Sequence, residues 1–251
     1  MSGRLAGKIA LITGAGGKMG QAFARAYAAE GAKLILTSRT PTVIAPLADD
    51  LTKLGAESVA LTADFTKGDD IDKLADNAWA AFGRVDTVLL STQPPNTLLG
   101  DLLTTPPEAW REMMESIVWG PLRLMQQLAP RMMENGGGSI VTVISSTGLS
   151  PTPGHDAYGI AKGALWLLTR YMAKEWGKGG IRVNAINPGS IVTGDNEEQI
   201  TELARRAGVL DRTALGRLGY TRECLGAAVH LASDEASFTS AQLINIDGGR
   251  M

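Results

Sequence analysis

Short runs rich in valine, isoleucine and leucine alternate with longer helical patterns along this whole sequence of 251 residues. Seven such runs are predicted strands, at 8–13, 33–38, 58–63, 85–91, 139–145, 181–187 and 241–247. Between them lie predicted helices, at 18–31, 42–55, 68–82, 106–134, 155–178 and 221–233. Continuous apolar strands are typical of parallel sheets covered on both faces, and strand–helix alternation forms right-handed β-α-β units. The pattern therefore predicts an α/β fold, with a doubly wound, seven-stranded parallel sheet in three α/β/α layers.

No internal repeat, low-complexity segment or linker divides the chain, so a single domain over 1–251 is predicted. One segment, 189–220, departs from the strand–helix rhythm, because it is polar and loop-like around the short helical stretch NEEQITELARRAG. Ligands of doubly wound sheets bind beyond the carboxyl ends of the strands. A long insertion after the sixth strand is therefore predicted to be a substrate-binding lid.

Charge and cysteine content exclude several classes of function. The net charge is −2 and acidic and basic residues are interspersed, so neither nucleic acid nor a membrane surface is an expected partner. No apolar run approaches the roughly 18 residues that span a bilayer. The single cysteine, Cys224, excludes an internal disulfide and is compatible with a reducing compartment. We expect a cytoplasmic enzyme whose large core needs no structural metal.

The stretch TGAGGKMG, at 13–20, follows the first strand directly and opens the first helix. This is the context of a phosphate-binding loop, because the helix N-terminus supplies unpaired N–H groups and a positive dipole end. Gly14 would permit the tight turn, while Gly16 and Gly17 would keep side chains away from a pyrophosphate. Gly20 would let the helix pack closely on the sheet. The alternative is a glycine-rich turn with a purely structural role.

The second strand ends at Ser38 and Arg39, where enzymes that use NAD commonly carry an acid that binds the ribose 2′-hydroxyl. An acid would repel the 2′-phosphate of NADP, whereas Arg39 could pair with it. Lys18, on the glycine loop, is a second cation in this region. The sequence therefore favours NADP(H) as cofactor over the alternative, NAD(H). In a purely structural interpretation, Arg39 is a solvated loop residue.

Tyr158 and Lys162 lie four residues apart at the start of a predicted helix, which places both side chains on one helical face. A phenol titrates at about pH 10, so it acts as an acid–base catalyst at neutral pH only when its anion is stabilised. A neighbouring ammonium group favours that charged form. Ser145 and Ser146 end the preceding strand, where a hydroxyl could hold a substrate oxygen. Each of these features alone also occurs by chance, and serines at strand ends are common turn formers.

The combination of motifs resembles the short-chain dehydrogenase/reductase family along essentially the entire chain. The resemblance rests on the glycine loop at 13–20, on Asp64 after the third strand, on the serine of the fifth strand and on Tyr158-x-x-x-Lys162. Two further stretches reinforce it, RVNAINPGSIVT at 182–193 and the terminal INIDGGRM. The resemblance implies a single Rossmann-type domain and an NAD(P)-dependent enzyme that acts on an alcohol or a ketone.

The family pattern also implies roles for the catalytic set. Tyr158 would be the general acid/base, and Lys162 would lower the pKa of the tyrosine and hydrogen-bond the nicotinamide ribose. Ser145 is preferred to Ser146 as the catalytic serine, because it lies thirteen residues before Tyr158 and seven after Gly138, both family-like intervals. Ser146 is kept as the reserve.

The remaining expected cofactor contacts also follow from the resemblance. Asp64 would meet the adenine amino group, whereas Asn184 would support its strand rather than the chemistry. Part of the cofactor site lies outside the glycine loop and would be formed by Phe65, Ser91, Thr92, Pro188, Gly189, Ile191 and Thr193. Met19, in the glycine loop, is a further expected cofactor contact.

Three departures from the family pattern stand out. Lys18 replaces a usual glycine of the loop. The residues after the fourth strand, 91–94, read STQP where the family has NNAG, so Gln93 could face the ligand. Ile117 occupies the position of an asparagine that often completes a catalytic tetrad and holds a proton-relay water. We expect that relay to be slower, rerouted or served by the adjacent Ser116.

The substrate pocket is expected to involve Gln93, Leu149, His155 and Ile191, with Ser145 and the 194–212 segment. Such a lining, with few fixed charges, favours a neutral small-molecule alcohol or ketone. In a purely structural interpretation, His155 is a helix-start or loop residue.

The leading hypothesis is an NADP(H)-dependent oxidoreductase, and the family resemblance implies a homotetramer or homodimer. The alternative is a nucleotide-binding sensor that has lost turnover. An enoyl reductase of the same superfamily is disfavoured, because such enzymes separate the tyrosine and lysine by more residues.

Overall fold

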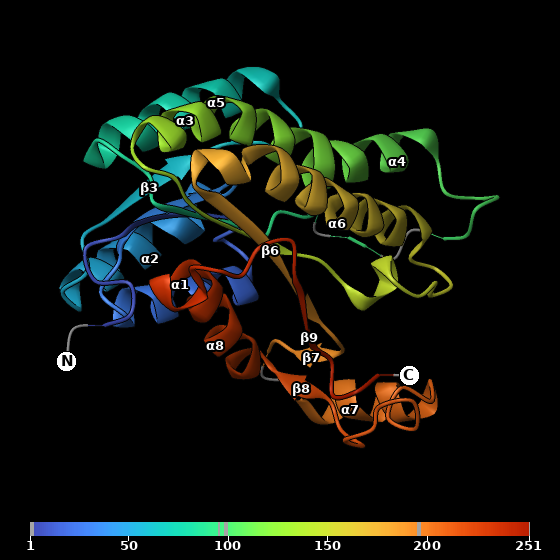
Figure 1. Ribbon diagram of the computed structural model, residues 1–251. Coiled ribbons are helices and arrows are strands. Elements are labelled where there is room, and N and C mark those ends of the chain that lie inside the picture. Colours follow the sequence, from blue (N-terminus) through green and yellow to red (C-terminus); the bar gives the residue numbers. More distant parts are fainter. Residues whose placement is uncertain (1–2, 95, 98–99, 195–196, 251) are drawn as a thin grey trace.

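The computed structural model describes residues 3–94, 96–97, 100–194 and 197–250. At its centre is a seven-stranded parallel sheet with the strand order β3-β2-β1-β4-β5-β6-β9 (Figure 1). The strands are β1 (Ile9–Thr13), β2 (Lys33–Ser38), β3 (Ser58–Thr62), β4 (Thr87–Leu90), β5 (Gly138–Val143), β6 (Ile181–Pro188) and β9 (Leu243–Ile246). The predicted fold class, including the number and direction of the strands, is confirmed.

Helices cover both faces of the sheet. One apolar layer packs under α1 (Lys18–Ala29), α2 (Pro41–Lys53) and α8 (Thr221–Ala232). The other packs under α3 (Gly68–Phe82), α5 (Gly120–Glu134) and α6 (Asp156–Trp176). The central strands, such as β1 and β4, are buried on both faces, which is why they read as continuous apolar runs, whereas the edge strands β3 and β9 are only partly buried.

The predicted helix over 106–134 is one uninterrupted helical stretch from 107 to 134, but its hydrogen-bond pattern changes within it. It consists of α4 (Pro107–Met114), a π-helical segment at Glu115–Trp119, and α5. Pro121, which has no N–H to donate, lies near the start of α5, which follows the π-helical segment directly, so it lies inside a continuous helical stretch rather than at a helix start. π-helical segments change which side chains face a neighbouring site, and this one lies beside the sheet's ligand-binding edge.

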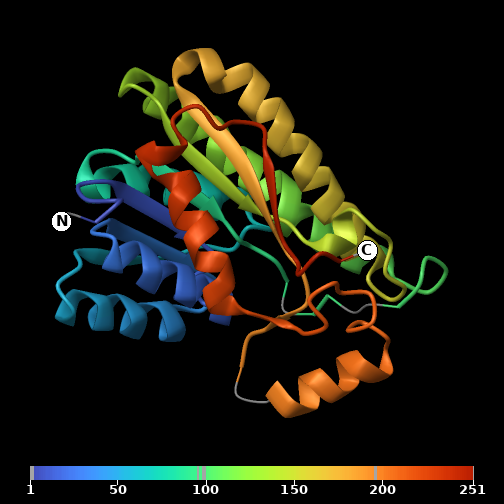
Figure 2. The same cartoon turned by 60° about the horizontal axis from the view of Figure 1, so that its bottom comes forward.

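Within the described residues of the 189–220 segment, which leave out 195–196, there are three short elements. These are β7 (Ile191–Val192), α7 (Glu197–Arg206) and β8 (Gly219–Tyr220), with β7 and β8 forming a small parallel sheet of their own. Figure 2 shows α7 apart from the two helical layers that cover the main sheet. The helix was expected from the sequence, whereas the two-residue strands were too short to give a pattern.

The strand order reverses between β1 and β4, because the chain moves outward from β1 to β3 and then returns to the other side of β1. Such a switch point opens a crevice at the carboxyl ends of the strands. Thr13 ties the two strands together there: its hydroxyl donates to the Leu89 carbonyl at 3.3 Å and accepts from the Ser91 N–H at 3.0 Å. None of the helices in the described part of the chain is long and apolar enough to cross a membrane.

Candidate active site

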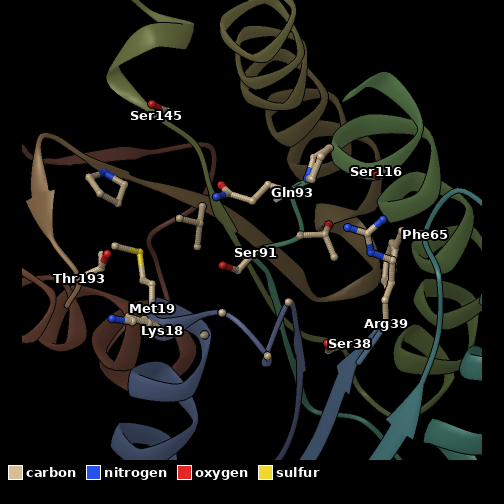
Figure 3. Close-up of a pocket in the computed structure, with 18 of the residues that line it drawn as sticks. Lys18, Met19, Ser38, Arg39, Phe65, Ser91, Gln93, Ser116, Ser145 and Thr193 are labelled. Atoms are coloured by element: carbon tan, nitrogen blue, oxygen red, sulfur yellow. The ribbon is translucent and has the colours of Figure 1, made fainter. Parts of the chain in front are cut away.

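A cavity of about 540 Å³ lies at the switch point of the sheet (Figure 3). It brings together most of the residues predicted from the sequence, namely Gly14, Gly16, Gly17, Lys18, Met19, Gly20, Ser38, Arg39, Phe65, Ser91, Thr92, Gln93, Ser145, Tyr158, Pro188, Gly189, Ile191 and Thr193. Its volume lies within the range of sites that hold cofactors and small molecules. Among the described residues, no group of three or more His, Cys, Asp or Glu side chains could hold a metal ion.

The glycine loop has the shape that a closely approaching phosphate group requires. Gly14 has φ +67°, and a Cβ on it would lie 2.5 Å from the Ser91 carbonyl oxygen. A Cβ on Gly20 would lie 2.2 Å from the Gly14 carbonyl oxygen. Gly17 precedes α1, whose first turn carries no acidic residue, so its N–H groups and dipole favour an anion. The loop therefore fits the pyrophosphate of a dinucleotide.

The end of β2 forms one side of the cavity. A Cβ on Gly16 would lie 2.5 Å from the Ser38 hydroxyl, so the glycine loop and this strand end are in direct contact. Arg39 is about half exposed, and its guanidinium lies 3.4 Å from the Glu112 carboxylate of α4. Lys18 is also exposed and lies on the opposite side of the cavity from Arg39 (Figure 3).

Asp64 does not itself line the cavity, although both of its neighbours, Ala63 and Phe65, do. Its carboxylate accepts hydrogen bonds from the N–H of Thr66 at 3.0 Å and from the hydroxyl of the same residue at 2.8 Å. Burial acts to raise the pKa of Asp64, but the Thr66 bonds and the charge of Arg39 outweigh it and lower the pKa. The carboxylate is therefore charged at neutral pH.

Tyr158 lies in the first turn of α6, and its side chain lines the cavity. Its hydroxyl donates to the side-chain oxygen of Gln93 at 3.2 Å. Burial raises the pKa of Tyr158, and the nearby Ser145 hydroxyl acts in the opposite direction. In the cofactor-free protein, burial and not Lys162 thus dominates the pKa of the phenol, which stays protonated at neutral pH.

Lys162 lies one turn further along α6 and is only 1% exposed. Its ammonium nitrogen donates to the Val143 carbonyl at 2.7 Å and lies 5.7 Å from the centre of the Tyr158 ring. The side chain is thus behind the tyrosine rather than in the lining of the cavity. Burial lowers its pKa to about 7.

Replacing Lys162 by Met in the cofactor-free protein is expected to raise the free energy of unfolding by about 1–3 kcal/mol below neutral pH, because a buried amine becomes apolar. The unfolded chain holds the lysine proton up to its ordinary pKa of 10.5, but the native protein holds it only up to about 7. Between these values the unfolded state binds more protons, so the wild type gains stability with rising pH relative to the variant. Urea unfolding at several pH values should show that the difference in the free energy of unfolding between Lys162→Met and the wild type decreases as the pH rises above neutral. A difference that does not change with pH would contradict the lowered pKa of Lys162.

The two serines at the end of β5 have different surroundings. The Ser145 hydroxyl oxygen lines the cavity and accepts from the Thr147 hydroxyl at 2.9 Å and from the Thr147 N–H at 3.3 Å. Because both bonds use it as acceptor, its own proton can be directed to a substrate oxygen. The Ser146 hydroxyl instead accepts from the Arg250 guanidinium at 2.9 Å and is buried away from the cavity.

The position of the family asparagine is apolar and occluded. Ile117, in the π-helical segment, is fully buried in a cluster with Met113 and Leu165. The preceding residue, Ser116, lines the cavity. The segment therefore presents a hydroxyl to the site where the family pattern has an amide.

Two predicted substrate residues lie outside the cavity lining. The ring nitrogen Nδ1 of His155 lies 3.0 Å from the Thr97 carbonyl, and the His155 ring centre is 6.3 Å from that of Tyr158. Leu149 is 46% exposed beyond the serine turn. His155 holds the loop after β4 rather than facing the cavity.

Sequence reasoning missed several cavity residues, namely Thr40, Val43, Ala63, Pro94, Val143 and Ile144. Val143 and Ile144 could have been expected, because they immediately precede Ser145 at a strand end. Val43 had no such signal, since its position in the cavity depends on how α2 packs beside the glycine loop.

Sequence and structure comparisons give one consistent result. A family model described as Enoyl-(Acyl carrier protein) reductase matches residues 14–250. The 7alpha-hydroxysteroid dehydrogenase of Escherichia coli (strain K12) is 32% identical over 98% of this chain and 95% of its own length. Dehydrogenase/reductase SDR family member 4 of Homo sapiens is 29% identical over 98% of this chain and 88% of its own length.

Solved structures of relatives share the whole fold. A 7α-hydroxysteroid dehydrogenase complexed with NADH and 7-oxo glycochenodeoxycholic acid has a TM-score of 0.90 at 30% identity, covering 99% of this chain and 96% of its own. L-sorbose reductase from Gluconobacter frateurii, complexed with NADPH and L-sorbose, has a TM-score of 0.90 at 27% identity, covering 100% of this chain and 99% of its own.

The fold and the cavity, together with these relatives, define an oxidoreductase that uses a nicotinamide cofactor and acts on alcohols or ketones. More specifically, the chain belongs to the short-chain dehydrogenase/reductase family.

Proposed function

We propose that this chain is an NADP(H)-dependent oxidoreductase that interconverts a secondary alcohol and a ketone, with Tyr158 as general acid/base. The observation that carries the proposal is that the phenol of Tyr158 and the Ser145 hydroxyl line the same cavity as the glycine loop. A proton donor and a hydroxyl that can hold a substrate oxygen thus lie in the same site as the dinucleotide cradle.

The residues of the chain divide the reaction between them. When bound, NADPH supplies the hydride that reduces the carbonyl carbon. Ser145 donates a hydrogen bond to the carbonyl oxygen, and Tyr158 transfers its phenolic proton to that oxygen as negative charge develops. The new C–H and O–H bonds replace the carbonyl π bond, and the phenolate regains a proton from solvent. In the oxidation direction the phenolate takes the proton of the alcohol.

Lys162 is proposed to act on the phenolate rather than on the substrate. Its ammonium nitrogen is held by the Val143 carbonyl, close to the Tyr158 ring, where a positive charge stabilises the anion left after proton transfer. In the dinucleotide complex it would also hydrogen-bond the nicotinamide ribose. Ser116 is proposed to hold a relay water in place of the family asparagine, because it is the polar side chain that the π-helical segment presents to the cavity.

The preference for NADP(H) rests on the end of β2. Ser38 and Arg39 line the cavity there, in place of an acid that would repel a 2′-phosphate. We assign Arg39 to that phosphate and Asp64 to the adenine amino group. The nicotinamide and its carboxamide would meet Pro188, Gly189, Ile191 and Thr193, while Met19, Phe65, Ser91 and Thr92 complete the cofactor contacts.

A ketone panel followed by nicotinamide absorbance tests the proposal. NADPH oxidation that depends on both a ketone and Tyr158 is the expected result. Tight NADPH binding without turnover, together with no effect of Tyr158→Phe, would support a nucleotide-binding sensor instead. An enoyl thioester in the same panel tests the activity named in the family model's description, which the four-residue spacing of Tyr158 and Lys162 disfavours.

The proposed enzyme is a homo-oligomer located in the cytoplasm. The exposed apolar side chains Ile160, Leu167 and Tyr171 on α6, with Trp119 on the π-helical segment, support a homotetramer or homodimer. We also propose a cytoplasmic enzyme in which 189–220 closes over the substrate as a lid. Light scattering of the purified protein measures the oligomeric state, and a monomer would refute this part.

A further inference from the structure

Gln93 is the residue whose contact with the catalytic tyrosine is least expected from the family pattern. It stands at the alanine position of that pattern, yet its side-chain oxygen accepts the Tyr158 hydroxyl at 3.2 Å. In Figure 3 its side chain points into the cavity, between Ser145 and Ser91. The amide thus lies where a substrate must approach the phenol.

The backbone that carries Gln93 is anchored close by. The Ser91 N–H is held by Thr13, and the Ser91 carbonyl lies against Gly14, with no room for a Cβ between them. On the other side, Pro94 is buried and has a fixed φ. Thr13 and Gly14 therefore anchor the backbone just before Gln93, at the start of the segment that follows β4, and the Gln93 side chain enters the cavity from there.

The phenol has a single proton, and two acceptors compete for it during reduction. In the cofactor-free protein the proton is directed to the Gln93 oxygen. When a ketone binds, Tyr158 must direct the same proton to the carbonyl oxygen, and Gln93 loses its donor. Gln93 is exposed in the cofactor-free protein, so its amide oxygen is left unpaired only when bound cofactor and substrate displace water from the cavity and the substrate supplies no donor.

We propose that Gln93 makes the site selective for ketones that carry a hydroxyl group on the carbon next to the carbonyl. The carbonyl oxygen takes the bonds from Tyr158 and Ser145, and the neighbouring hydroxyl donates to Gln93. The spacing suits two adjacent oxygens, because the phenol oxygen and the amide oxygen are only 3.2 Å apart. This inference rests on the proposed ketone reduction and specifies its substrate class. A site built to bind a hydroxyl rejects the analogue without it, since its own polar group is then left unpaired.

Matched pairs of ketones test the inference, with NADPH as cofactor. Acetoin is compared with butanone, and phenacyl alcohol with acetophenone, by the ratio of their kcat/KM values. The wild type should prefer the hydroxylated member of each pair that it reduces.

Gln93→Met, which keeps the length of the side chain but removes the amide, should lower this ratio of kcat/KM values about tenfold. Gln93→Glu keeps an acceptor and should preserve the ratio. Because each ratio is compared between variants, the greater intrinsic reactivity of hydroxyketones cancels.

Arg39→Ala is the matched control, since it changes the cavity at the cofactor end. Arg39→Ala should weaken NADPH binding. It should leave unchanged the ratio of kcat/KM for the hydroxylated ketone to kcat/KM for its partner without the hydroxyl. Equal ratios in the wild type and Gln93→Met would overturn the role of Gln93 while leaving ketone reduction intact. Reduction of neither member of any pair would instead refute the proposed function, and the inference with it.

Discussion

Tyr158→Phe is expected to lower kcat for ketone reduction by about 10²–10⁴-fold, because it removes the proton donor and keeps the ring. The hydroxyl it removes makes one hydrogen bond to Gln93, whose net contribution to stability is about 1 kcal/mol. The variant should therefore fold and bind NADPH much like the wild type. NADPH oxidation under saturating ketone measures the loss, and fluorescence titration measures the cofactor affinity.

Tyr171→Phe provides a matched control on the same helix. Tyr171 also lies on α6 but is 57% exposed, away from the cavity. Its hydroxyl should contribute less than about twofold to kcat, so the two substitutions separate a catalytic phenol from a general effect of losing a hydroxyl on α6. If Tyr158→Phe kept more than a tenth of the wild-type rate, another group would have to be the proton donor.

Arg39→Asp is expected to weaken NADPH binding about 10²-fold while changing NADH binding much less. The substitution removes charge-assisted hydrogen bonds to the 2′-phosphate and places a like charge beside it. It also leaves Glu112 without its cation, which adds to the negative potential at that end of the cavity. Binding titrations with the two cofactors at one ionic strength measure the change, since salt screens this exposed site.

Two companion variants sharpen the cofactor assignment. Lys18→Ala should affect both cofactors to a similar small extent, because Lys18 lies across the cavity from Arg39. Glu112→Gln should strengthen NADPH binding a few-fold, since Arg39 no longer has to leave a carboxylate to meet the phosphate. An equal loss of NADPH and NADH affinity in Arg39→Asp would refute the 2′-phosphate assignment.

The phosphate loop and the Tyr158/Lys162 pair could be predicted because their signals are local. Gly14 and Gly20 are needed for contacts within one strand–turn–helix unit, and four-residue spacing on a helix determines that two side chains share a face. Both kinds of information are contained in a few consecutive residues. The same is true of the apolar strand runs, whose alternation with helices predicted the sheet that the structure has.

The substrate end of the cavity was harder to predict, because its residues come from loops. His155, for which the sequence left both a substrate contact and a helix-start role open, lies at the start of α6 with its ring against the Thr97 carbonyl, and Leu149 lies outside the cavity lining. The helix over 106–134 was predicted without a change of register, and its π-helical segment buries Ile117, while Ser116, the predicted substitute for the asparagine, lines the cavity. No periodicity in the sequence marks such local changes of helical register.

The sequence alone was sufficient to determine the parallel α/β fold, the glycine loop between β1 and α1, and the common helical face of Tyr158 and Lys162, because each depends on neighbours along the chain. Only the tertiary structure decided that Ser146 binds Arg250 and that the Tyr158 hydroxyl donates to Gln93. The partners of the first contact are 104 positions apart in the sequence and those of the second are 65 positions apart. Both contacts therefore depend on how strands and loops pack together. Packing of distant segments therefore determines which side chains surround Tyr158 in the cavity, whereas local patterning determines the scaffold that carries them.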